Sequence, residues 1–160
     1  MEYIVLQQLT PLDGEEGFRL LQRIGEKGND FTNPMHGKSF AAYKNWLIKQ
    51  DKWSRKEGLP DGYLGQTCFW LVADGVIVGI RKLRRGLTKQ SRLEGDNMGY
   101  AIAPNQRGKA LATKYISLFL SKAQEKIIGE MLLIKVKNFN YPSKVLFEKN
   151  GCKVIREMDG

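Results

Sequence analysis

A β-hairpin near the middle of the chain is the feature that most limits how the chain can fold. Two apolar runs, residues 67–72 and 76–80, flank a turn that contains Asp74 and Gly75. A turn of this kind between runs of β-forming residues is a strong signal for two antiparallel strands. The chain is therefore expected to contain an antiparallel pair at its centre.

The remaining elements are predicted from hydrophobic periodicity and turn residues. Further strands are expected over residues 3–9, 97–103, 131–136 and 153–156, and helices over residues 11–24, 36–56, 112–127 and 142–149. An aromatic stripe in the second helix is interpreted as core. The resulting order, β-α-α-β-β-β-α-β-α-β, favours an α/β (α+β) fold with a mixed sheet flanked by helices. The 160 residues contain no repeat or linker, so a single domain is expected.

Composition argues against several classes of protein. The chain has two cysteines, Cys68 and Cys152, and one histidine, His36. Metal clusters built from these residues and a nucleophile–His–acid triad are therefore not expected. No apolar run approaches the roughly 20 residues that span a bilayer, and the N-terminus lacks the pattern of a signal peptide. The expectation is a reduced, cytoplasmic, soluble protein without a metal or a membrane partner.

The net charge of +9 is placed unevenly. Residues 1–60 contain 9 basic and 8 acidic side chains, whereas residues 61–160 contain 17 and 9. The excess positive charge of residues 61–160 indicates an anionic partner, such as a nucleic acid, a phosphorylated cofactor or an acidic surface. A solvated basic face is the alternative. Six of these cations lie in residues 81–92 with no acid among them. This run is interpreted as a solvated loop, and attraction of an acidic acceptor or of a cofactor's phosphates is the alternative.

The stretch after Pro104 carries the strongest chemical signal. A predicted strand ends there, and a helix is expected to start within Gln106-Arg107-Gly108-Lys109-Ala110-Leu111-Ala112. Unpaired N–H groups and the helix dipole make a helix N-terminus a good phosphate site, and Arg107 and Lys109 add formal charge. The bend just past Pro104 is thus expected to aim bare amides and two cations at a diphosphate. The spacing fits neither the Walker loop nor G-x-G-x-x-G, and ordinary surface residues at a helix start are the alternative.

This loop resembles the pyrophosphate loop of the GNAT superfamily of acyl-CoA-dependent N-acetyltransferases, which reads Q/R-x-x-G-x-G/A. Residues 107–112 match that pattern, with Ala110 where a glycine is expected. Residues 99–104 look like the family's fourth strand, and residues 140–152 look like its closing segment, N-x-x-S followed by L-Y-E-K-x-G-F. Residues 31–34 and 59–63 also look similar to a bacterial subgroup of predicted acetyltransferases with unassigned substrates.

The resemblance implies one GNAT domain over residues 1–160, with a mixed, mostly antiparallel central sheet and helices on both faces. Residues 1–65 would form the acceptor side and residues 66–157 the cofactor-binding core. The implied donor is acetyl-CoA, and the acceptor is a primary amine on a small molecule or a peptide. The residues implied to bind the cofactor are Ile102 and Ala103 through their backbone, Gln106, Arg107, Gly108, Lys109, Ala110, Leu111 and Ala112 at the pyrophosphate, and Asn140 and Ser143 in the closing segment.

Catalysis would require a carboxylate that helps remove a proton from the amine. The family often has a glutamate near the start of its fourth strand and a tyrosine in its last helix, where this chain has Asn97 and Phe147. A phenyl ring has no proton to donate. Glu94 and Asp96 are the candidate bases, with a polar turn as the alternative interpretation. Two tyrosines are candidate acids, although packing explains each of them better: Tyr100 and Tyr141.

Two other functions stay open. A non-catalytic acyl-CoA-binding sensor of the same fold would account for Asn97 and Phe147. A nucleic-acid-binding module would suit the net charge of +9, but the chain lacks the marks of a zinc finger or an RNA-recognition motif. A homodimer that exchanges strands between subunits also stays open.

Overall fold

The computed structural model describes residues 3–26, 31–84, 98–107, 111–126, 141–154 and 157. Four strands form one sheet in the order β1 (Ile4–Gln8), β2 (Gln66–Ala73), β3 (Val76–Arg84) and β4 (Met98–Ile102), and every neighbouring pair is antiparallel. The helices are α1 (Glu15–Ile24), α2 (Phe40–Ser54), the short 3₁₀-helix η1 (Pro104–Gln106), α4 (Leu111–Lys126) and α5 (Tyr141–Lys149).

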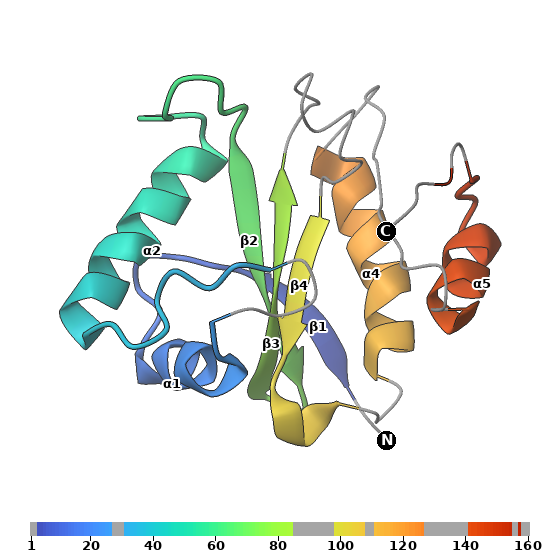
Figure 1. The fold of residues 1–160 in the computed structure, drawn as a ribbon, viewed down its shortest axis with the longest axis horizontal. Coiled ribbons are helices and arrows are strands. Elements are labelled where there is room, and N and C mark those ends of the chain that lie inside the picture. The colour runs from blue at the N-terminus through green and yellow to red at the C-terminus, as the bar shows by residue number, and fades with distance from the viewer. Residues whose placement is uncertain are drawn as a thin grey trace.

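The sheet lies between two helical layers. Helices α1 and α2 cover one face, α4 covers the other, and α5 packs against α4 (Figure 1). The predicted α+β architecture with helices on both faces is confirmed, as are the hairpin and the strands predicted over residues 3–9 and 97–103. The strand predicted over residues 131–136 lies outside the described residues. Of the strand predicted over residues 153–156, the two described residues, Lys153 and Val154, lie in no strand.

Both faces of β2 are buried, as expected for a strand that is covered on each side. Cys68, Trp70 and Val72 belong to the core beneath α1 and α2, whereas Leu71 packs toward α4. The interpretation of the aromatic stripe of α2 as core is confirmed for Tyr43 and Trp46, which belong to the first of these cores, but not for Phe40, which is 40% exposed.

The second helix begins four residues later than the sequence predicts. Its first residue is Phe40 rather than His36, because the Ser39 hydroxyl caps the helix by accepting a hydrogen bond from the Ala42 amide at 3.1 Å. An N-cap of this kind satisfies one of the amides that a helix start leaves without a partner.

A network of hydrogen bonds connects the turn before α1 to side chains of β2 and α2. The buried indole of Trp70 donates to the Asp13 carboxylate at 2.7 Å, and the Tyr43 hydroxyl donates to the Gly14 carbonyl at 3.0 Å. The Lys44 ammonium donates to the Asp13 carbonyl at 3.0 Å. Burial, and then the charge of Asp13, raises the pKa of Tyr43 above its usual range. The turn before α1 is therefore held by side chains that are distant in sequence.

Asn33 fastens the connection between α1 and α2. It is 3% exposed, and its side-chain Nδ2 donates to the carbonyls of Leu21 at 2.6 Å and Gly25 at 2.7 Å. These carbonyls lie at the end of α1, where the last turn has no partners within the helix. The loop predicted from the residue types around Pro34 is thus a C-terminal cap of α1.

Replacing Asn33 by alanine is expected to lower the free energy of unfolding by about 2–3 kcal/mol, because the buried Leu21 carbonyl and the partly buried Gly25 carbonyl lose their donor. Equilibrium urea unfolding measures the change. The adjacent and exposed Thr32→Ala is the matched control, with an expected effect below about 0.5 kcal/mol. Equal losses in the two variants would contradict the capping role.

The interpretation of residues 81–92 as a loop is wrong for residues 81–84, of which only Arg84 is exposed to solvent. Residues 81–84 continue β3, Arg81 is only 2% exposed, and Lys82 is half-buried with its Nζ 5.0 Å from the centre of the Phe31 ring. The aliphatic stems of these side chains pack in the core, and aromatic rings face their charged ends. Residues 85–92 lie outside the described residues.

Candidate functional site

In the part of the chain that the structure describes, no strand pairs with the outer edge of β4, which we call the open edge of β4. The Ala103 amide donates to the Val78 carbonyl on β3 at 2.8 Å. Backbone groups alternate in direction along an antiparallel strand, so those of Ala101 also face β3, whereas those of Tyr100 and Ile102 face away from it. Among the described strands, β4 is the last in the sheet. Its outward N–H and C=O groups are therefore placed to bind an extended ligand.

The two residues that were predicted to meet a pantetheine arm through their backbone, Ile102 and Ala103, differ in the direction of their backbone groups. Ile102 has its backbone groups at the open edge, as that role requires. Ala103 does not, because its amide is bonded to Val78 and its carbonyl accepts from the Gln106 amide at 2.8 Å. The prediction that the Ala103 backbone meets a ligand does not hold for its amide, since the strand pairing extends one residue beyond β4.

The turn after Pro104 uses its own amides. The Gln106 amide bonds to Ala103, and the Arg107 amide bonds to the Pro104 carbonyl at 3.4 Å, so η1 satisfies both. The expectation of bare amides directly after Pro104 is wrong at these two residues, because a proline at the first position favours a local 3₁₀ turn. The candidate donors that remain are the amides of residues 108–112.

Those remaining candidates are only partly described. Gly108, Lys109 and Ala110 lie outside the described residues. Leu111 and Ala112 open α4, where the first amides of a helix have no acceptor within it. Helix α4 starts near the end of β4 and runs back along the sheet (Figure 1). The positive end of the α4 dipole therefore lies at the same end of the sheet as the outward backbone of Ile102.

Arg107 links this turn to the open edge of β4. The side chain is exposed, and its Nε donates to the Ile102 carbonyl at 3.1 Å. Two of the predicted site residues are thereby in direct contact. A guanidinium has five N–H donors, so this single bond leaves it able to bind an anion as well.

The predicted catalytic pair and the closing segment are less fully described. Glu94, Asp96 and Asn140 lie outside the described residues. Ser143 lies in the first turn of α5. Phe147, which stands where a tyrosine was expected, is 9% exposed and packs against Ile116 and Leu120 of α4.

The two tyrosines named as candidate acids differ in their surroundings. Tyr141 is 68% exposed at the start of α5. Tyr100 is half-buried, and its ring faces the guanidinium of Arg81, whose Cζ lies 4.4 Å from the ring centre. The interpretation of Tyr100 as a packing residue agrees with this contact.

Sequence reasoning missed two buried polar groups. One is Arg81, which was hidden within the basic run; its position opposite Phe69 in the hairpin was the signal that could have revealed its burial. The other is the side chain of Gln50, whose Oε1 meets the start of β2. It accepts a hydrogen bond from the side-chain Nε2 of Gln66 at 2.5 Å and one from the Cys68 thiol at 3.5 Å. No pattern in the sequence joins Gln50 on α2 with these strand residues.

The two cysteines are expected to differ in reactivity. Both are free thiols, and Cys68 is buried whereas Cys152 is partly exposed. Burial raises the pKa of Cys68 to about 11 and also raises the pKa of Cys152. Since the thiolate is the reactive form, an aromatic disulfide reagent at neutral pH should titrate Cys152 in the native protein and Cys68 only after unfolding.

Counting thiols by absorbance before and after adding denaturant tests this prediction. Cys152→Ser should abolish the native signal. Raising the pH toward the pKa of Cys68 should increase its rate of reaction, because more of the thiol is then ionised. Native reaction of Cys68 as fast as that of Cys152 would contradict the prediction.

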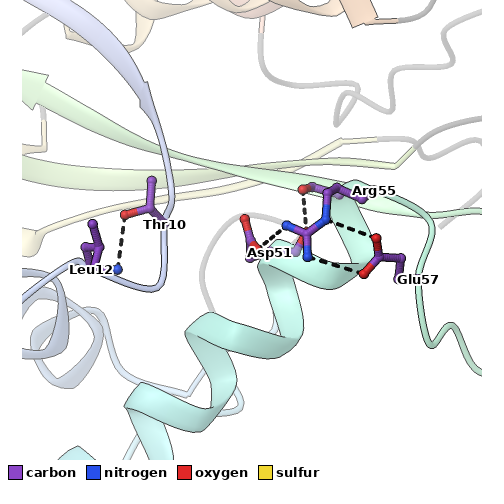
Figure 2. Close-up of polar contacts among 6 residues, drawn as sticks. Thr10, Leu12, Asp51, Arg55 and Glu57 are labelled. Carbon is purple, nitrogen blue, oxygen red and sulfur yellow. Dashed lines mark hydrogen bonds and ion pairs between the residues drawn. The ribbon is translucent and has the colours of Figure 1, made fainter.

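A charged cluster at the end of α2 is explained by surface ion pairs. The Arg55 guanidinium donates to the carboxylates of Asp51 and Glu57 (Figure 2). The hydrogen bond from Arg55 lowers the pKa of Glu57 below its usual value. Arg55 and Glu57 are exposed to solvent, which weakens such pairs.

Within the described ranges, no three His, Cys, Asp or Glu side chains lie close enough to hold a metal ion. None of the helices described there combines the length and the apolar character needed to cross a bilayer.

Comparison with solved structures identifies proteins of similar fold. No protein-family profile and no curated protein sequence matches the chain. Among solved structures, a GNAT-family acetyltransferase from Streptococcus pneumoniae is similar with a TM-score of 0.55 and 18% identity, over 93% of this chain and 84% of that one. A Trypanosoma brucei acetyltransferase gives 0.57 and 15%, over 99% and 98% of the two chains.

A third similar structure is an aminoglycoside N-acetyltransferase in complex with CoA. It has a TM-score of 0.54 and 14% identity, over 100% of this chain and 94% of that one. These structures share with this chain the architecture of an antiparallel sheet between helical layers. The chain therefore has the fold of the GNAT acetyltransferases.

Proposed function

We propose that the chain is an N-acetyltransferase that moves an acetyl group from acetyl-CoA to a primary amine by direct transfer. The observation that carries the proposal is the hydrogen bond from Arg107 to the Ile102 carbonyl, which brings a predicted phosphate-binding cation to the open edge of β4. The fold similarity adds support, since one of the similar structures is described as a complex with CoA.

The described residues fit this cofactor. A pantetheine arm contains amide groups, which can pair with the outward N–H and C=O groups of Tyr100 and with the outward N–H of Ile102, whose carbonyl already accepts from Arg107. A diphosphate needs donors and positive charge, which the first amides of α4 and the Arg107 side chain supply. The proposed site also includes Gly108, Lys109 and Ala110, together with Asn140 and Ser143.

Each part of the chain has a role in the proposed reaction. Bound acetyl-CoA supplies an activated acyl thioester. The outward amides of β4 polarise the acyl carbonyl, and Glu94 or Asp96 accepts a proton from the amine, whose nitrogen attacks the acyl carbon. The C–N bond forms as the C–S bond breaks, and CoA leaves as a thiolate that takes up a proton from solvent. Residues 1–65, which form β1, α1 and α2, hold the acceptor against the edge of the sheet so that the reacting atoms are positioned.

Ligand-induced stabilisation tests the cofactor part of the proposal. Adding acetyl-CoA at about 100 times its dissociation constant should stabilise the folded protein by about 2.7 kcal/mol. For a chain of this size, that corresponds to a rise of about 5–10 °C in melting temperature. The absence of any shift at millimolar acetyl-CoA would overturn the proposal.

A thiol-release assay across a library of amines tests the transfer itself. The expected result is release of CoA with one class of amine, and its loss in the double variant Glu94→Gln/Asp96→Asn. Small polyamines, amino sugars, amino-acid derivatives and peptide N-termini belong in the library, because each offers a primary amine. Retained activity in the double variant would show that another group serves as the base.

One observation favours a second candidate, a non-catalytic acyl-CoA sensor with the same fold. The ring at Phe147 lies in an apolar cluster with Ile116 and Leu120, and it offers no proton to a departing thiolate. Tight binding of acetyl-CoA without thiol release for any amine would support the sensor. Release of CoA with any amine would reject it.

A further inference from the structure

Arg81 is a buried cation whose setting calls for an explanation. It is 2% exposed, and its Cζ lies 4.4 Å from the centre of the Tyr100 ring and 4.7 Å from the centre of the Phe119 ring. These rings come from β4 and α4, so Arg81 on β3 joins three elements. We call Arg81 and these two rings the Arg81 clamp.

The clamp buries a positive charge. Among the described residues, the Nε of Arg81 meets no hydrogen-bond acceptor. Burial lowers the pKa of Arg81 to about 10, so the guanidinium stays charged at neutral pH. Burying a charge is costly, and an apolar side chain of similar volume could fill the space without that cost.

A guanidinium does one thing that an apolar side chain cannot do. It attracts the faces of two aromatic rings at once and so fixes the spacing between them. One of these rings belongs to Tyr100, which lies directly opposite Arg81 in the pairing of β3 with β4. The backbone of the same residue faces the open edge of β4, whereas Phe119 belongs to the helix whose first turn lies near the end of β4.

We propose that Arg81 is a positioning residue for the acyl-CoA site, which clamps Tyr100 against Phe119 and so sets where the open edge of β4 lies relative to α4. The inference rests on the proposed function. A pantetheine arm would lie along β4 and a diphosphate at the start of α4, so one cofactor molecule spans both elements. Loosening the clamp should misalign the two halves of the site and leave each half intact.

Calorimetric titration with two ligands tests this role. CoA engages both halves, whereas adenosine 3′-phosphate 5′-diphosphate carries the diphosphate but lacks the pantetheine arm, so it engages only the half at the start of α4. In Arg81→Met, the dissociation constant of CoA should rise about tenfold, while that of this nucleotide should stay within about twofold. Arg81→Lys should recover part of the CoA affinity, because an ammonium also attracts aromatic faces.

Other outcomes decide against the clamp. A folded Arg81→Met that binds CoA like the wild type would overturn it. Equal weakening of both ligands would also overturn it, because that result indicates general damage to the fold. Melting temperatures of all variants identify such damage directly.

A second measurement is independent of CoA. In the wild type, the NMR signal of the Arg81 Nε–H should be shifted upfield by the two ring currents, and Phe119→Leu should move it toward its ordinary position. An ordinary position in the wild type would reject the clamp, whether or not CoA binds. If the wild type binds no CoA but shows the shifted signal, the proposed function and the cofactor-positioning role both fail, and the clamp is only a structural contact.

Discussion

Replacing Arg107 by glutamate is expected to weaken the binding of CoA by about 100-fold, which corresponds to nearly 3 kcal/mol. The Arg107 side chain lies at the open edge of β4 and donates to the Ile102 carbonyl, where its remaining donors can bind a diphosphate. A charge-assisted hydrogen bond contributes about 1.5–3 kcal/mol, and a carboxylate at this place would also repel the phosphates. Isothermal titration calorimetry with CoA gives the dissociation constants.

A matched variant separates this local effect from the change in overall charge. Lys38→Glu alters the net charge by the same amount at an exposed position just before α2. Its affinity for CoA should stay within about twofold of the wild type. Comparable weakening by the two variants would mean that the protein's overall charge attracts the ligand, and Arg107 would lose its assigned place in the site.

Gly17→Ala is expected to lower the free energy of unfolding by about 2–3 kcal/mol. At an exposed position inside a helix, the same change stabilises by about 1 kcal/mol. The sign is reversed here because a Cβ at Gly17 would lie 2.6 Å from the Tyr43 hydroxyl and 2.7 Å from Cζ2 of Trp70. Hydrogen bonds to Gly14 and Asp13 hold these two side chains, so neither can move away without breaking one.

Equilibrium urea unfolding measures the effect, with Gly14→Ala as the control. A Cβ at Gly14 would meet nothing within 4 Å. Gly14 is the N-cap of α1, where alanine is somewhat worse than glycine, so a loss of less than about 1 kcal/mol is expected. A Gly17→Ala variant as stable as the wild type would show that α1 can shift away from β2, against the tight packing of this face.

Elements whose signal is local were predictable. The hairpin followed from two apolar runs around Asp74 and Gly75, and the structure pairs β2 with β3 there. The strand before Pro104 and the helix after residue 110 were likewise predicted from hydrophobic periodicity and from the proline that ends the strand. Local patterns suffice in such segments because side-chain alternation and backbone turns depend on neighbouring residues.

Features that depend on contacts between distant segments were not predictable. The backbone of Ala103 was expected to meet a ligand, but its amide bonds to Val78 on β3. Arg81 was expected to be solvated because its neighbours in sequence are basic, whereas its neighbours in space are the rings of Tyr100 and Phe119. The charge of a segment is a property of the sequence, but its exposure is decided by what packs against it.

The amino-acid sequence by itself determined those elements whose signal is local, and it pointed to the segment after Pro104 as the candidate phosphate site. Only the tertiary structure decided which backbone groups stay available there, because hydrogen bonds across the sheet and within η1 take the amides of Ala103, Gln106 and Arg107. It also decided that the Arg107 side chain meets the edge of β4. A hydrogen bond needs two groups at the right distance, and only the folded chain sets that distance.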